Sequence, residues 1–104
     1  MNKIEFINMI DTIADIMEVK PNEIQIRRMK RKWGSCSSKG RLTFNIDLLD
    51  KNNDFIREAI IHELLHLRYE KHDTLFNNLL NIYKERTENI DKNKDTEFIR
   101  IDDY

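Results

Sequence analysis

The three histidines of the chain, His62, His66 and His72, all fall within the stretch IIHELLHLRYEKH, residues 60–72. On a helix, His62 and His66 lie on one face one turn apart, a spacing at which both can bind the same metal ion. Catalytic zinc sites use three protein ligands and leave the fourth position for water. Glu63 follows the first histidine, so its carboxylate can take a proton from metal-bound water and return it to the leaving group. The spacing predicts a Zn²⁺ site that activates water and lacks only its third ligand.

Two residues are candidates for that third ligand. His72 lies six residues after His66, so it can join the site only if the helix ends near Tyr69 and the chain bends back. No glycine or proline marks this bend, and residues 68–71 must form it unaided. Glu85 lies nineteen residues after His66 and is the alternative. We expect His72 to be the ligand, because good N-cap residues directly after it indicate that a new helix begins there.

The elements that must position these residues can be traced from the hydrophobic pattern. Apolar residues Ile4, Ile7, Ile10, Ile13 and Met17 recur at helical spacing, which predicts an N-terminal helix that Pro21 stops. Two segments, 24–26 and 42–46, alternate apolar and polar residues as strands do. Glycines and serines lie between them, so residues 24–46 are expected to form a β-ribbon with a basic, irregular connection.

Two further helices are expected after the ribbon. Asn53 or Asp54 can cap the helix that carries the histidines, whose buried stripe is predicted to be Ile56, Ile60, Leu64 and Leu67. Another helix is expected to begin near Asp73 or Thr74. The sequence therefore predicts an α+β fold, in which a small twisted sheet or ribbon packs on an N-terminal helix, an active-site HExxH helix and a backing helix.

Length and composition restrict the class of protein. The chain has 104 residues, 36% of them charged and 39% hydrophobic, with a formal net charge of −1. We expect one small domain, with residues 1–86 as the catalytic unit and residues 87–104 as a C-terminal tail. The apolar runs are too short to span a membrane, and no signal peptide is visible. Cys36 is the single cysteine, so an intrachain disulfide is excluded and a cytoplasmic location is expected.

The motifs WGSCSSKGRLTFN and HELLHLRYEKHDTLF resemble those of the minigluzincins, a family of compact gluzincin-like zinc metallopeptidases. The resemblance covers about half of the chain by motif, within residues 27–76. It implies a metalloendopeptidase without membrane helices, with His62, His66 and His72 as zinc ligands and Glu63 as general base. The HELLHLRYEKH spacing also matches the three-histidine pattern of metzincins, but Tyr69 stands where those enzymes carry a glycine. The family further suggests latency, with a C-terminal segment that blocks the cleft.

The charge pattern agrees with a docked tail. Residues 27–41 contain seven basic and no acidic side chains, whereas residues 85–104 contain seven acidic and four basic ones. The apolar residues Phe98, Ile99 and Ile101 could add hydrophobic contacts between the tail and the cleft. The hypothesis is that this tail occupies the substrate cleft, either of its own chain in a monomer or of a partner chain in a homodimer. The alternative is a frayed, solvated terminus.

Other functions and roles stay open at the level of sequence. The main expectation is hydrolysis of a peptide or protein substrate. A basic cluster near a metal site could also suit a phosphate ester or nucleotide. A zinc-stabilised domain that binds nucleic acid is a third possibility, which the near-zero net charge disfavours. Tyr69 and Tyr83 are both candidates to stabilise an oxyanion. Cys36 is expected to be a small packing residue and Trp33 to lie in the core or the cleft wall.

Overall fold

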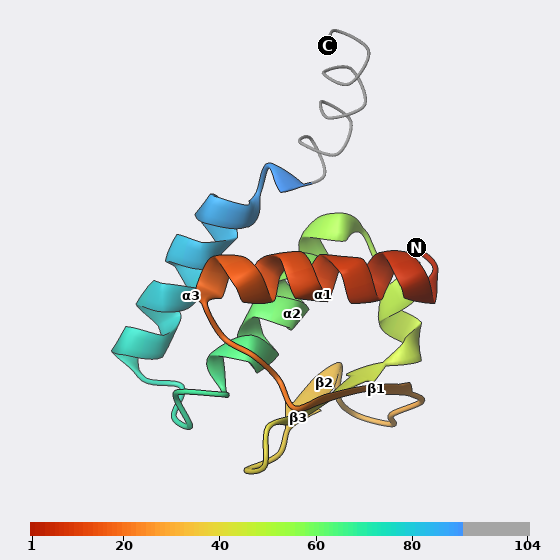
Figure 1. Cartoon of the computed structure of the whole chain (residues 1–104), viewed down its shortest axis with the longest axis horizontal. Coiled ribbons are helices and arrows are strands. Elements are labelled where there is room, and N and C mark those ends of the chain that lie inside the picture. The colour runs from red at the N-terminus through yellow and green to blue at the C-terminus, as the bar shows by residue number, and fades with distance from the viewer. Residues whose placement is uncertain (91–104) are drawn as a thin grey trace, which may run out of the picture.

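The computed structural model describes residues 1–90, and the predicted tail beyond Ile90, including its apolar cluster, lies outside the described residues. Figure 1 shows a small sheet below a layer of two crossing helices, with a third helix along one flank. The fold is α+β, as predicted. In chain order the elements of the described part are α1 (Lys3–Met17), β1 (Glu23–Arg27), β2 (Gly34–Cys36), β3 (Arg41–Asn45), the 3₁₀ helix η1 (Ile46–Asp50), α2 (Asn53–Leu65) and α3 (Thr74–Thr87).

Helix α1 begins with a capping box. The Asn2 side chain accepts a hydrogen bond from the Glu5 amide, and the Glu5 carboxylate accepts one from the Asn2 amide. The predicted apolar stripe is rotated, since Ile4 is 74% exposed. The helix ends at Met17, where Glu18 adopts a left-handed conformation (φ 57°), so Pro21 is not what stops it. The face that is actually buried consists of Phe6, Met9, Ile10, Ile13, Ala14 and Met17.

The sheet is not the simple ribbon expected from the sequence. Strand β3 is central, pairing in parallel with β1 and antiparallel with β2. Residues 28–33 therefore cross from one edge of the sheet to the other, past β3. At that second edge β2 forms a third strand that the sequence did not predict. The predicted second strand stops at Asn45, because Ile46 already belongs to η1. Alternation identified two strands, but alternation carries no information on which neighbour each strand pairs with.

Helix α2 is the centre of the molecule and contacts α1, α3 and β2. Its N-cap is Asn52, whose side chain accepts a hydrogen bond from the Phe55 amide, rather than Asn53 or Asp54 as predicted. Ile56, Ile60 and Leu64 are fully buried as expected, whereas Leu67 lies beyond the helix and is partly buried. Because this helix packs on three sides, the side chains of its last turn are held in fixed positions.

Helix α3 backs the active-site helix. Asp73 is its N-cap and accepts a hydrogen bond from the Phe76 amide, as the sequence predicted. Phe76 and Thr87, near its two ends, are fully buried. Among residues 1–90, no helix has the length and apolar character needed to cross a membrane.

Candidate functional site

The three histidine side chains converge on one point beside α2. The Nε2 atoms of His62 and His66 are 3.3 Å apart, and those of His66 and His72 are 2.8 Å apart. In the described part of the chain, the three histidines form a group that could hold a metal ion. Their ligand atoms all lie within 4.8 Å of one another. Glu85, the alternative third ligand, is exposed on α3 and is not part of the group.

The bend that brings His72 back needs no glycine. Helix α2 ends at Leu65, earlier than predicted, with His66 as its C-cap residue in ordinary helical geometry. The Tyr69 amide donates to the Leu65 carbonyl, and the Tyr69 carbonyl accepts from Nδ1 of His66 at 3.0 Å. No residue from 66 to 73 has a positive φ. The histidine itself therefore stabilises the turn that delivers the next histidine.

Phe76 packs among all three imidazoles. Its ring centroid lies 5.2 Å from that of His62, 4.9 Å from that of His66 and 4.8 Å from that of His72. Phe76 is fully buried, so the first turn of α3 and the histidines form one packed unit. Aromatic rings at these separations restrain one another's orientation.

The donor set fits a zinc ion. A tetrahedral site with Zn–N bonds of about 2.0–2.1 Å requires nitrogens about 3.3 Å apart. The Nε2 atoms of His62 and His66 have this separation, whereas those of His66 and His72, at 2.8 Å, would have to move apart slightly. A carbonyl can only accept, so Nδ1 of His66 carries the proton and Nε2 has its lone pair free. Burial, and then the charges of neighbouring histidines, lowers the pKa of His62. Burial also lowers the pKa of His66, so burial favours the neutral form of both rings, which is the form that binds metal.

Glu63 is the buried acid of this site. It is only 8% exposed, and burial raises the pKa of its carboxyl to about 7, although the nearby charge of Lys32 lowers it. Gly34 of β2 leaves the space that Glu63 fills, because a Cβ at Gly34 would lie 2.9 Å from Glu63 Cγ. The carboxyl is thus tuned to exchange protons near neutral pH.

This raised pKa predicts that Glu63 destabilises the metal-free fold at high pH. Between its unfolded pKa of 4.5 and about 7, the folded protein retains a proton that the unfolded chain has released, so stability falls as pH rises. We expect Glu63→Gln, which carries no charge, to be more stable than wild type by about 1 kcal/mol at pH 5 and about 3 kcal/mol at pH 8. Urea unfolding with a metal chelator at both pH values measures this difference. A stability difference between Glu63→Gln and wild type that does not grow with pH would contradict the raised pKa of Glu63.

An open cleft lies over the histidines and Glu63. Its volume is about 920 Å³, and one wall is the edge strand β2 with its following turn, where Cys36 is half-buried. Burial raises the pKa of the Cys36 thiol, and the charge of Glu63 raises it further. A second, smaller pocket of about 370 Å³ is also lined by His62 and Glu63 and is walled by Trp33 and Phe55. Trp33 is therefore a pocket-wall residue, 39% exposed, rather than a core residue.

The structure brings together His62, Glu63, His66 and His72, but it does not bring either candidate tyrosine to the cleft lining. Sequence reasoning missed Gly34, whose role depends on close approach by a helix distant in sequence. It also missed Asn45, which is 5% exposed and whose amide donates to the carbonyls of Met29 and Lys32. An asparagine between a strand and a helix signals a cap, and it does accept from the Asp47 amide. Its hydrogen bonds to the carbonyls of Met29 and Lys32 could not be predicted from the residues around it in sequence.

Comparisons with known proteins give the family of the chain and similar folds. Residues 2–94 match the family model described as YgjP-like, metallopeptidase domain. The fold is similar to that of the metallopeptidase zymogen of Pyrococcus abyssi abylysin, at 23% identity and a TM-score of 0.65, covering 88% of this chain and 93% of that one. It is also similar to the metallopeptidase zymogen of Methanocaldococcus jannaschii jannalysin, at 22% identity and a TM-score of 0.67, covering 89% and 96%. No curated protein sequence matches the chain. The fold that the sequence resemblance implied is therefore confirmed.

Proposed function

Because the chain belongs to the YgjP-like metallopeptidase domain family, we propose that it is a zinc-dependent peptidase in which Glu63 acts as the general base. The observation that carries the proposal is the convergence of three imidazole Nε2 atoms beside a buried glutamate in one open cleft. His62, His66 and His72 would hold the ion. When bound there, zinc supplies a Lewis acid that polarises the scissile carbonyl and makes water more acidic.

Glu63 moves the protons of the reaction. Its carboxylate takes a proton from the attacking water, and the resulting acid gives the proton to the amine nitrogen as the carbon–nitrogen bond breaks. A base whose pKa lies near the working pH can perform both transfers, and burial brings the pKa of Glu63 to about 7. Gly34 supports this role because it lets the edge strand approach the carboxylate closely.

The edge strand offers a way to hold a peptide. β2 pairs with β3 on one side only, and its residues Gly34, Ser35 and Cys36 line the cleft. An extended substrate can add to such an edge through main-chain hydrogen bonds, which position the scissile bond without demanding a particular sequence. This geometry favours an endopeptidase that acts on extended segments.

The test is hydrolysis of a peptide library by the zinc-loaded protein, with a nucleotide and phosphate-ester panel run in parallel. We expect cleavage of peptides that a chelator abolishes and added zinc restores. Zinc-dependent cleavage of nucleotides with no cleavage of peptides would overturn the peptidase assignment. A gel shift with nucleic acid that persists in Glu63→Ala, together with no hydrolysis, would favour a zinc-stabilised binding domain.

Latency is a further part of the proposal. The opposite charges of residues 27–41 and 85–104 support a tail that covers the cleft. Thr87 is fully buried and Ile90 packs against the core, so a truncation should end at Ile90 to leave the fold intact. We expect the truncated protein to cleave peptides several-fold faster than the full chain. Equal rates, in two proteins with equal zinc content and thermal stability, would show that the tail does not inhibit.

A further inference from the structure

Hydrolysis of a peptide bond places negative charge on the carbonyl oxygen, and the cleft must stabilise it. The tyrosines suggested by the sequence do not serve. Tyr69 packs partly against the core and contributes only its backbone to the site. Tyr83 also packs against the core, with Arg86 over its ring. A different donor is needed beside Glu63.

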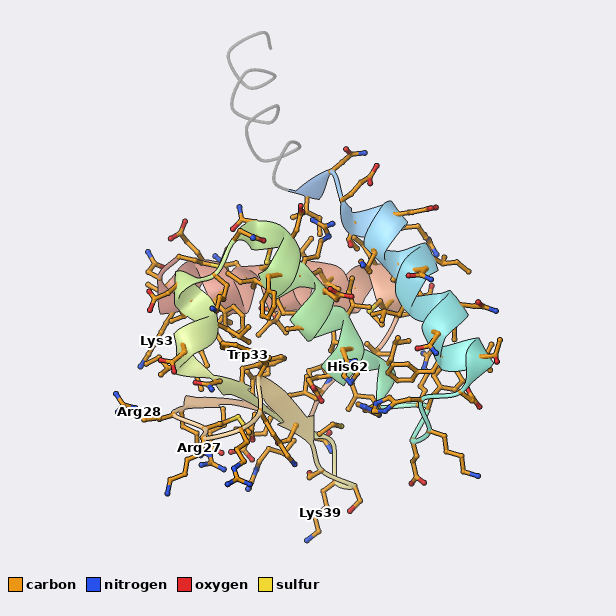
Figure 2. All side chains as sticks on the ribbon, turned by 180° about the vertical axis from the view of Figure 1, so that it is seen from behind. Lys3, Arg27, Arg28, Trp33, Lys39 and His62 are labelled. Carbon is orange, nitrogen blue, oxygen red and sulfur yellow. The ribbon has the colours of Figure 1, made fainter. Side chains whose placement is uncertain are left out.

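Lys32 is a basic residue that lines the same cavities as Glu63. It lines both the open cleft and the smaller aromatic-walled pocket, the two cavities that share Gly34, His62 and Glu63. It lies close enough to Glu63 for its charge to lower the pKa of that carboxyl. The next residue, Trp33, lies with His62 at the junction of helix α2 and the sheet, as the labels in Figure 2 show.

The backbone at Lys32 is fixed from several sides. The Asn45 side-chain amide donates to the Lys32 carbonyl at 2.9 Å, and the Asn45 backbone amide donates to the Trp33 carbonyl at 2.9 Å. The Trp33 ring stacks edge-on against Phe55, with centroids 5.2 Å apart. Gly34 then abuts Glu63. These contacts hold the backbone at and after Lys32, while the Lys32 side chain itself is exposed.

Several other cations of the described region have a partner, and Lys20, Lys39 and Arg68 line the larger cleft but not the smaller pocket. Arg41 pairs with Glu23, and Lys84 pairs with Glu58. Arg68 donates to the Glu18 carbonyl, and Lys51 lies over the rings of Trp33 and Phe55. Figure 2 shows Arg27 and Arg28 at the side of the sheet away from His62, and Lys39 on the turn after β2, farther from α2. Within residues 1–90, Lys32 is the basic residue that lines both cavities beside Glu63.

We propose that Lys32 is a catalytic residue whose ammonium donates a hydrogen bond to the scissile carbonyl oxygen and stabilises its developing negative charge. The inference rests on the proposed peptidase function. As the water oxygen bonds to the carbonyl carbon, the carbonyl π pair moves onto the oxygen that faces Lys32. Glu63 holds the proton released by the water. When the tetrahedral species collapses, that electron pair re-forms the carbonyl, the carbon–nitrogen bond breaks, and the proton passes from Glu63 to the amine. Lys32 stays protonated throughout.

Kinetics of Lys32→Ala, Lys32→Arg and the control Arg28→Ala test the role. Removal of one oxyanion donor lowers kcat by about 10²–10³-fold, so we expect a loss of this size in Lys32→Ala, with KM within threefold of wild type and zinc content unchanged. Lys32→Arg should recover part of the loss, and Arg28→Ala, which removes an exposed charge from the side of the sheet away from His62, should match wild type. A kcat within threefold of wild type in Lys32→Ala, or a loss confined to KM, would overturn the proposal.

A binding measurement separates this proposal from the peptidase assignment. A phosphinic peptide carries a tetrahedral anion in place of the scissile bond, and calorimetry on zinc-loaded wild type and Lys32→Ala measures its affinity. We expect Lys32→Ala to bind it at least tenfold more weakly. If wild type cleaves no peptide, the peptidase assignment fails, but weaker binding by the variant still supports an anion-stabilising Lys32. Equal affinity in both proteins, or no binding by either, counts against Lys32.

Discussion

Replacing His72 with alanine is expected to lower the zinc affinity of the protein by more than about 100-fold, whereas Glu85→Ala leaves it unchanged. Loss of an outer-shell partner already costs about 10–100-fold in affinity, and His72 is placed to bind the metal directly. Its Nε2 lies 2.8 Å from that of His66. The histidine group of the described residues has three members, so none is left to replace His72. Two imidazoles on one helix turn would remain, which is one ligand fewer than catalytic zinc sites use.

Competition with a fluorescent chelator measures the affinities, and metal analysis after dialysis gives the zinc content per chain. Glu85→Ala is a matched control, because Glu85 is exposed on α3 and outside the histidine group. Circular dichroism establishes that both variants are folded. Zinc loss in Glu85→Ala with retention in His72→Ala would reverse the ligand assignment and favour a glutamate as third ligand.

Replacing Glu63 with glutamine is expected to reduce kcat for peptide hydrolysis by about 10²–10⁴-fold, the range attributed to general acid–base catalysis. Glutamine preserves the size of the side chain and so keeps its packing against Gly34, but it cannot accept the proton of the attacking water. Zinc content should stay at the wild-type level, since Glu63 is not one of the converging ligands. Single-turnover kinetics with the best library peptide measures the loss.

Glu85→Ala again provides the comparison, because it removes a carboxylate without touching the cleft. Hydrolysis in Glu63→Gln at more than a tenth of the wild-type rate would exclude Glu63 as the base. The expected loss of kcat, together with the greater stability expected for the same variant at pH 8, would show that the carboxylate lowers stability but is needed for catalysis.

The local parts of the site could be predicted because they depend on short-range periodicity. The four-residue spacing of His62 and His66 fixes them on one helix face, and Asp73 carries the chemistry of a helix cap. The fold class followed from the same patterns. The position of His72 was harder to predict, because its turn has no glycine and is held by the hydrogen bond between His66 and the Tyr69 carbonyl. This turn follows the end of α2 at Leu65, which the sequence pattern placed too late.

The rest depends on contacts between segments far apart in sequence. Three-residue β2 is too short to show alternation, and the parallel pairing of β1 with β3 is decided by how the crossover folds. Gly34 is informative only once Glu63 is seen against it. Asn45 anchors Met29 and Lys32 from at least thirteen residues away. No pattern within a sequence window reports such pairs.

The packing of Phe76 among the three imidazoles has a consequence for how the protein acquires its metal. Because α3 and the bend hold the rings in place, the conformational entropy of ordering the ligands is lost during folding and not during metal capture. The site can therefore accept an ion after the chain has folded, through the open mouth of the cleft, without a coupled folding step. Metal uptake by the finished protein should then follow simple bimolecular kinetics, and ion exchange need not unfold any part of it.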